Sequence, residues 1–175
     1  MFIIKTSKSK KDLTVLDNME DLFDIRTDLL KNPIAKEICS DNNIGEWFLE
    51  AVPIMYYELD VSAKTEDGNI MLSEKLKEHP HSTRMRYVFH ELVHAIQHSL
   101  DKNKDIDKTR EYLKREDEQE AFKYQLKYDE KKLSKKDVKD YIKNLLDHHD
   151  VQKKDKEILV KELTSKMKSS PDLDY

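Results

Sequence analysis

The stretch HELVHAIQH, residues 90–98, holds three of the seven histidines in a chain of 175 residues. Apolar residues recur around and within it at helical spacing: Val88, Phe89, Leu92, Val93 and Ile96. This spacing predicts an amphipathic helix from about residue 83 to residue 100, with its apolar face buried. The other elements are expected to pack around this helix.

His90 and His94 are four residues apart, which places both imidazoles on one face of a helix, about one turn from each other. Two neutral ring nitrogens at that spacing can share one tetrahedral metal ion. Glu91 directly follows the first histidine, so its carboxylate lies beside the metal and can take a proton from a bound water. The pattern predicts one zinc ion per chain, with Glu91 as general base. The alternative is an amphipathic helix with surface histidines, which would not need the apolar flanks.

His98 is not expected to bind the same ion. It lies eight residues after His90, and that separation is roughly 12 Å along a straight helix. One ion cannot bind both imidazoles at about 2 Å. A longer pattern with a glycine and a third histidine also fails, because Gln97 and Leu100 occupy those two positions. His98 is expected to face solvent or to lie beside a ligand.

The third protein ligand is expected from REDEQEAFKYQ, residues 115–125. Glu118 is the preferred candidate, because Ala121 lies three residues further along the same face and a small residue allows close approach of two helices. Glu120 is the alternative third ligand, and Glu116 ranks behind both. The stretch is acidic throughout, so a solvated helix face remains an alternative for each glutamate.

The rest of the chain predicts a mostly helical α+β fold. Helices are expected over residues 11–30, 33–39, 47–52, 109–128 and 134–146, with a last helix ending near residue 167. A strand over 54–61, the turn TEDGN at 65–69 and a return strand at 70–72 predict a β-hairpin. Residues 2–6 predict a further short strand, and DHHD at 147–150 predicts a turn.

Composition narrows the class of protein. Hydrophobic residues make up 37% of the chain and charged residues 39%, which predicts a modest core under a highly charged surface. The net charge of -4 lacks the basic excess of a duplex-binding domain, so no nucleic-acid partner is expected. No apolar run suits a signal peptide or a membrane span. With a single cysteine, Cys39, these features predict a soluble, cytoplasmic protein without a membrane partner.

HELVH at 90–94, followed by EQEA at 118–121, resembles the gluzincin class of zinc metallopeptidases. The likeness is to small, minimal members and to peptidases of phage and bacterial genomes, and it covers residues 54–128. It implies a zincin-like core, in which a small β-sheet packs on the HExxH helix and a second helix carries a glutamate ligand. It therefore also implies a division into a core over 1–130 and a C-terminal helical extension over 131–175.

The resemblance implies a role for each matching residue. His90, His94 and Glu118 would bind zinc, and Glu91 would be the general base. The segment just before the active helix would be the edge strand that binds the substrate as an extra strand: Ile70, Met71, Leu72 and Ser73. Donors for the anionic intermediate are sought among five side chains: Tyr112, Tyr124, Tyr128, His79 and His81.

One position departs from the resemblance. Larger families commonly place an Asp or Asn directly after the alanine of the second motif, where it supports a ligand histidine, and Phe122 stands there in this chain. The support of the ligand histidines is therefore unassigned. The function expected is a zinc-dependent endopeptidase acting on a peptide or protein substrate. The alternative is a non-catalytic protein-binding module that retains a zincin fold.

Overall fold

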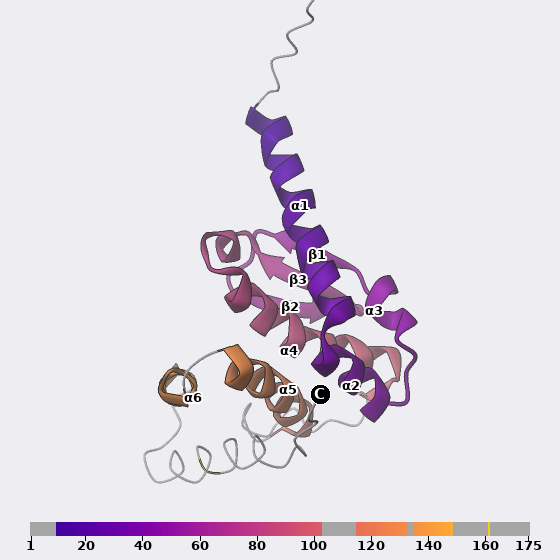
Figure 1. The fold of residues 1–175 in the computed structure, drawn as a ribbon, viewed down its shortest axis with the longest axis vertical. Helices are drawn as coiled ribbons and strands as arrows, with labels where there is room; N and C mark the ends of the chain where they lie inside the picture. The colour runs from indigo at the N-terminus through magenta and orange to yellow at the C-terminus, as the bar shows by residue number, and fades with distance from the viewer. Residues whose placement is uncertain (1–9, 103–114, 133–134, 149–160, 162–175) are drawn as a thin grey trace, which may run out of the picture.

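The computed structural model describes residues 10–102, 115–132, 135–148 and 161 (Figure 1). In chain order the elements are α1 (Lys10–Lys31), α2 (Pro33–Asp41), α3 (Trp47–Ala51), β1 (Ile54–Tyr57), β2 (Ala63–Glu66), β3 (Asn69–Ser73), the 3₁₀ helix η1 (Glu74–Glu78), α4 (His81–Ser99), α5 (Glu116–Lys132) and α6 (Lys135–His148). The fold is the expected mostly helical α+β type, with a small sheet on α4 and with α5 packed against α4.

The helix α4 lies at the centre of the core. It begins directly after Pro80 and ends at Ser99, close to the expected bounds. Its buried residues lie on more than one face, because the sheet covers one side and α5 covers another. Several of its apolar side chains are fully buried: Met85, Val88, Phe89, Leu92, Val93 and Ile96. The side chains of α4 are therefore carried by a rigid, well-packed helix.

Two features of α5 bear on its packing against α4. Ala121, three residues after Glu118, is fully buried in the core, and its small side chain allows a close approach of a neighbouring helix. Nearer the start of α4, Nε of Arg86 donates to the Asp129 carboxylate, at 2.9 and 2.8 Å from its two oxygens. The Tyr141 ring of α6 lies over the same guanidinium, 4.3 Å from it. Burial raises the pKa of Asp129, and Arg86 partly opposes that rise.

The sheet differs from the expected hairpin. Its strand order is β1-β3-β2, with β1 parallel to β3 and β2 antiparallel to it. The turn at Asp67-Gly68 is confirmed, but it joins β2 to β3, whereas the first strand of the expected hairpin was residues 54–61. That strand ends at Tyr57 and pairs with the other side of β3. The sequence AKTE of β2 has no apolar run, because this short strand lies at an edge of the sheet.

The predicted edge strand at Ile70–Ser73 is wrong, because these residues form most of β3, the central strand, which is paired on both sides. The burial of Ile70, Leu72 and Ser73 fits a central position. Among the described strands, the edges of the sheet are β1 and β2. Of these two, β2 makes the more extensive contact with α4.

The long helix α1 runs across the sheet (Figure 1). Its side chains contact α3, β1 and α4. Arg26 donates to the main-chain oxygens of Leu49 in α3 and of Val52, which directly follows that helix. Asp21 pairs with Arg84 of α4 at 2.7 Å and accepts a hydrogen bond from the Tyr56 hydroxyl of β1. These charge-assisted contacts hold the N-terminal helices against the layer formed by the sheet and α4.

Other boundaries shift modestly. α5 continues to Lys132, and α6 continues through His148, so residues 147 and 148 of the expected turn are helical and its last two residues lie outside the described part of the chain. The expected strand at 2–6, the start of the helix at 109–114 and the last helix after residue 149 lie outside the described residues. Among the described helices, none is long and apolar enough to cross a membrane.

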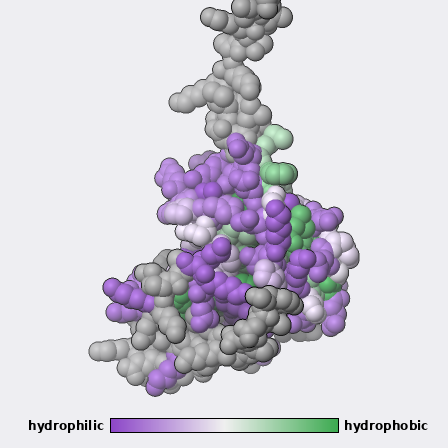
Figure 2. All heavy atoms as spheres, viewed as in Figure 1, coloured by the Kyte–Doolittle hydropathy of each residue, from purple (hydrophilic) through white to green (hydrophobic). Residues whose placement is uncertain are grey.

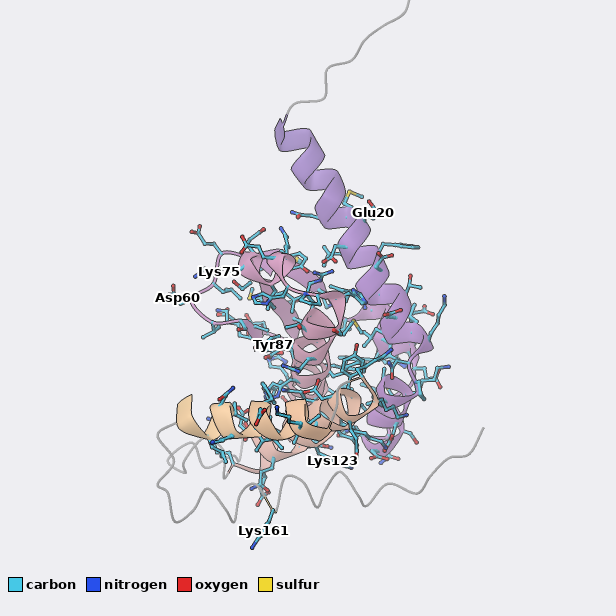
Figure 3. All side chains as sticks on the ribbon, turned by 60° about the vertical axis from the view of Figure 1, so that its left-hand side comes forward. Glu20, Asp60, Lys75, Tyr87, Lys123 and Lys161 are labelled. Atoms are coloured by element: carbon cyan, nitrogen blue, oxygen red, sulfur yellow. The ribbon has the colours of Figure 1, made fainter. Side chains whose placement is uncertain are left out.

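The surface is strongly polar, as the composition predicts. Among the residues coloured in Figure 2, hydrophilic ones cover most of the visible face. Exposed charged side chains such as Glu20 and Lys75 extend outward from α1 and η1 (Figure 3). The exposed large apolar residues include Met19 and Phe23 on α1 and Trp47 on α3. Met19 and Phe23 are four residues apart and therefore lie on one face of α1.

We expect Ala121→Leu to lower the free energy of unfolding by about 1–3 kcal/mol, because extra methyl groups overpack a filled interface. The same change should also move Glu118 away from α4. Urea denaturation measures the first effect, and the exposed Ala51→Leu serves as control. Equal stability of the two variants would contradict close packing at Ala121.

Candidate metal centre

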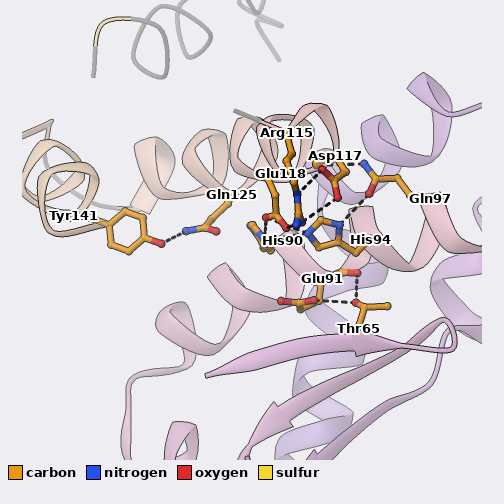
Figure 4. Close-up of polar contacts among 10 residues, drawn as sticks. All are labelled: Thr65, His90, Glu91, His94, Gln97, Arg115, Asp117, Glu118, Gln125 and Tyr141. Atoms are coloured by element: carbon orange, nitrogen blue, oxygen red, sulfur yellow. Dashed lines mark hydrogen bonds and ion pairs between the residues drawn. The ribbon is translucent and has the colours of Figure 1, made fainter. Parts of the chain in front are cut away.

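Two helices bring His90, His94 and Glu118 together. Each residue offers one ligand atom, and the three atoms lie within 4.8 Å of one another. His90 is 6% exposed and Glu118 is 3% exposed. The group is the expected pair of histidines from α4 and the preferred glutamate from α5 (Figure 4). Such a group could hold a metal ion.

The distances within the group fit a tetrahedral ion. Nε2 of His90 and Nε2 of His94 are 3.2 Å apart, and Oε2 of Glu118 is 3.3 Å from the first and 3.5 Å from the second. A tetrahedral zinc ion about 2.0 Å from each donor separates neighbouring donors by about 3.3 Å. The three side chains therefore stand at the spacing that zinc requires.

The two oxygens of the Glu118 carboxylate have different surroundings. Arg115 donates to Oε1 at 2.6 Å and also pairs with the Asp117 carboxylate. Oε2 is buried and accepts no hydrogen bond of good geometry, although both imidazole nitrogens lie near it. A buried carboxylate oxygen needs a positively charged or hydrogen-bonding partner. A protonated imidazole of the group can provide that partner, and a metal ion at its centre could take the place of the proton.

The histidines and the glutamate of the group shift one another's pKa. Burial alone would lower the pKa of His94. The Glu118 carboxylate outweighs burial and, together with smaller effects of Glu91 and Gln97, raises that pKa to about 9. Burial acts to raise the pKa of Glu118, but His90 and His94 more than offset it and hold that pKa well below its usual range. Both shifts favour a positively charged His94 opposite an ionised Glu118.

Glu120, the alternative third ligand, lies outside the group. Its Oε2 accepts a hydrogen bond from Nε2 of Gln97 at 2.9 Å, and its Oε1 lies 3.4 Å from Nδ2 of Asn42. Oε1 of Gln97 lies 2.9 Å from Nδ1 of His94. Glu120 thus contacts the metal group through an intervening glutamine. Glu116, the third candidate, is exposed.

The Glu91 carboxylate is held by the sheet. Glu91 is 6% exposed, and Oγ1 of Thr65 lies 2.9 Å from its Oε2 and 2.9 Å from its main-chain oxygen. Thr65 belongs to β2, the edge strand nearest α4. Figure 4 shows the two residues on the side of α4 that faces the strands, beside the histidines. The hydroxyl therefore ties a carboxylate adjacent to the metal group to an edge strand.

His90 is positioned by packing. The Phe122 ring of α5 meets its imidazole edge to face, with centroids 4.7 Å apart. Nδ1 of His90 is buried and has no hydrogen-bond partner among the described residues. Phe122 therefore fills the space beside this ligand where the resemblance leads one to expect an Asp or Asn.

Other candidates from the sequence do not join the group. His98 is exposed, and its ring lies close to Gly68 in the turn between β2 and β3. The Tyr124 hydroxyl donates to Asp41, and the Tyr128 ring stacks on Phe89. His81 pairs with Asp28 at 2.8 Å, and His79 is exposed at the end of η1. Tyr112 lies outside the described residues.

Sequence reasoning missed three residues that contact the ligand group or Glu91. Gln97 lies three residues after His94 on the same helix, so its spacing was a usable signal. Arg115 lies three residues before Glu118, and the same argument applies to it. Thr65 lies 26 residues from Glu91 in sequence. Only the folded sheet brings it near, and no local pattern points to it.

Comparison with protein-family models, curated proteins and solved structures found no match to this chain. The class of the protein therefore rests on its own residues. They define a mostly helical α+β protein with a buried His-His-Glu group on two packed helices, consistent with an HExxH motif completed by a distant glutamate.

We expect purified, tag-free protein to bind about one zinc ion per chain, because the donors have the spacing and number of a catalytic zinc site. Glu118→Ala should remove most of that binding, whereas Glu116→Ala on the same helix should not. Elemental mass spectrometry after dialysis measures both. Full zinc retention in Glu118→Ala would contradict the site.

Zinc binding at neutral pH should release about one proton, because the raised pKa of His94 keeps its imidazole charged until the metal displaces the proton. Affinity should therefore rise with pH up to about 9 and then level off. Calorimetry in buffers of different ionisation enthalpy measures the proton count. Metal binding without proton release at neutral pH would contradict this assignment.

Proposed function

We propose that the protein is a zinc-dependent peptidase of the gluzincin class. The observation that carries the proposal is the buried group of His90, His94 and Glu118 with donor distances of 3.2 to 3.5 Å. The HExxH spacing supplies the neighbouring Glu91 on the same rigid helix. Peptide hydrolysis is the reaction for which this set of side chains is best suited.

A zinc ion held by these three ligands would act as a Lewis acid and lower the pKa of its bound water towards about 7. The Glu91 carboxylate would take a proton from the attacking water and pass it to the leaving amine. The hydroxyl of Thr65 would hold that carboxylate in one orientation. Arg115 would hold Oε1 of Glu118, so that Oε2 alone faces the histidines.

The substrate would bind along β2 rather than along β3. Among the described strands β2 pairs only with β3, so its other edge presents main-chain donors and acceptors without a strand partner. An extended peptide added there would be read through its backbone, which tolerates many sequences. Because Thr65 of β2 contacts Glu91, a peptide on that edge would pass close to the proposed base.

A non-catalytic binding module with a structural zinc is the competing function. Structural sites surround zinc with four protein ligands, whereas catalytic sites use three and leave one position for water. Among the described residues, the group contains three ligand residues. The burial of Glu91 beside that group favours the catalytic alternative, since a structural site has no use for it.

Glu91→Gln should lower the rate of peptide cleavage by about 10²- to 10⁴-fold, because general acid–base catalysis contributes a factor of that size. Zinc content should stay unchanged, since Glu91 does not belong to the ligand group. Mass spectrometry of a diverse peptide library incubated with zinc-loaded protein measures cleavage. Exposed Glu50→Gln provides a control with the same change of charge. Equal cleavage by wild type and Glu91→Gln would rule out the proposed base.

A further inference from the structure

We propose that Gln97 and Glu120 position His94 for metal binding: they fix which ring nitrogen carries its hydrogen and thereby raise the affinity of the site. This inference rests on the proposed function only in requiring that the His-His-Glu group binds a metal. It does not depend on peptide cleavage.

The orientation of the Gln97 amide follows from its partners. Gln97 is 2% exposed, and its Nε2 lies 2.9 Å from a carboxylate oxygen of Glu120 and 3.3 Å from the main-chain oxygen of Asp117. Both partners can only accept hydrogen bonds. The amide nitrogen must therefore face them, which turns Oε1 towards Nδ1 of His94 at 2.9 Å.

The amide orientation decides the state of the imidazole. Oε1 of Gln97 can only accept, so Nδ1 of His94 must carry the hydrogen. In the neutral ring this leaves the lone pair on Nε2, which is the atom that faces His90 and Glu118. A ligand histidine whose second nitrogen donates to a fixed acceptor is held in orientation and becomes a more basic donor.

Glu120 is itself anchored by a third helix. Nδ2 of Asn42, at the end of α2, lies 3.4 Å from Oε1 of Glu120 and also donates to the main-chain oxygen of Ile38 at 3.0 Å. Lys102 donates to Oδ1 of Asn42 at 2.7 Å, which fixes the amide of Asn42 in turn. The chain of contacts therefore runs from α2 through α5 to a ligand on α4.

The two histidines differ in this support. Nδ1 of His90 has no hydrogen-bond partner among the described residues, and Phe122 packs against its ring. Within the described part of the chain, His94 is thus the ligand whose second nitrogen is held by a hydrogen bond to a protein acceptor. Loss of the Gln97 contact should weaken metal binding without removing a ligand.

The test is zinc affinity in Gln97→Met, which keeps the length of the side chain and removes its hydrogen bonds. Competition with a chromophoric chelator at neutral pH should show affinity lowered by about 10- to 100-fold, the usual cost of losing such a partner. Gln119→Met is the matched control, because it makes the same change on α5 outside the metal group. Circular dichroism of each variant confirms that the helices are retained.

A double variant provides the rescue. Gln97→Glu combined with Glu120→Gln exchanges the amide and the carboxylate. A carboxylate at position 97 still accepts from Nδ1 of His94, and an amide at position 120 can donate to it. Zinc affinity in the double variant should exceed that of Gln97→Met, because the acceptor for Nδ1 of His94 is restored, although a carboxylate at position 97 cannot donate to the main-chain oxygen of Asp117.

Nitrogen-15 NMR of the zinc-loaded protein provides a second readout that general loss of packing would not mimic. The Nδ1–H signal of His94 should be protected from solvent exchange in wild type, in Gln119→Met and in the double variant, and unprotected in Gln97→Met.

Wild type that binds no zinc would overturn both this inference and the proposed function. Zinc-binding wild type with equal affinity and equal His94 protection in Gln97→Met and Gln119→Met would overturn this inference alone. A double variant in which the Nδ1–H of His94 is protected but zinc affinity is no higher than in Gln97→Met would also overturn it.

Discussion

Glu118 reaches the two histidines only because α5 packs directly against α4. The donors come from residues 90, 94 and 118, and their separations of 3.2 to 3.5 Å leave little tolerance for a shift of either helix. The fully buried Ala121 allows the close approach, and Phe122 fills the space beside His90. The site is therefore a property of a helix interface, and its geometry depends on the core on both sides of α4.

Polar contacts at both ends of this interface set its register. Near the start of α4, Arg86 pairs with Asp129 under the ring of Tyr141. Near its end, Gln97 contacts Glu120 and the main chain of Asp117. A buried ion pair often contributes little net stability and more to selecting one arrangement over others. Here both contacts favour the one alignment that brings Glu118 opposite His90 and His94.

The sheet makes a separate contribution, since it holds the proposed base rather than the ligands. Thr65 of β2 contacts both the carboxylate and the main chain of Glu91. The packing of α5 on α4 thus completes the ligand group, and the contact with β2 positions the proposed base. The two contacts are made on different sides of α4. This division explains how one helix can carry both functions without the base entering the ligand group.

Much of the site could be predicted from the sequence, because its signals are local. The spacing of His90 and His94 and the apolar flanks define α4, and the small Ala121 after Glu118 indicates a close helix contact. The sequence predicts the wrong first strand for the hairpin, because AKTE in β2 becomes a strand through pairing with β3 and not through its own composition. The same cause led to the wrong edge strand at Ile70–Ser73. The contact of Gln97 with His94 has a local spacing that predicts it, whereas that of Thr65 with Glu91 depends on the tertiary fold.

The measurement that tests the central claim most directly is an anomalous-difference map, recorded at the zinc absorption edge, from crystals of the zinc-loaded protein. The account predicts a strong peak about 2.0–2.2 Å from Nε2 of His90, Nε2 of His94 and Oε2 of Glu118. It also predicts Gln97 and Arg115 in their present contacts with His94 and Glu118. A peak bound by Glu120 in place of Glu118, or the absence of zinc between the two histidines, would contradict it.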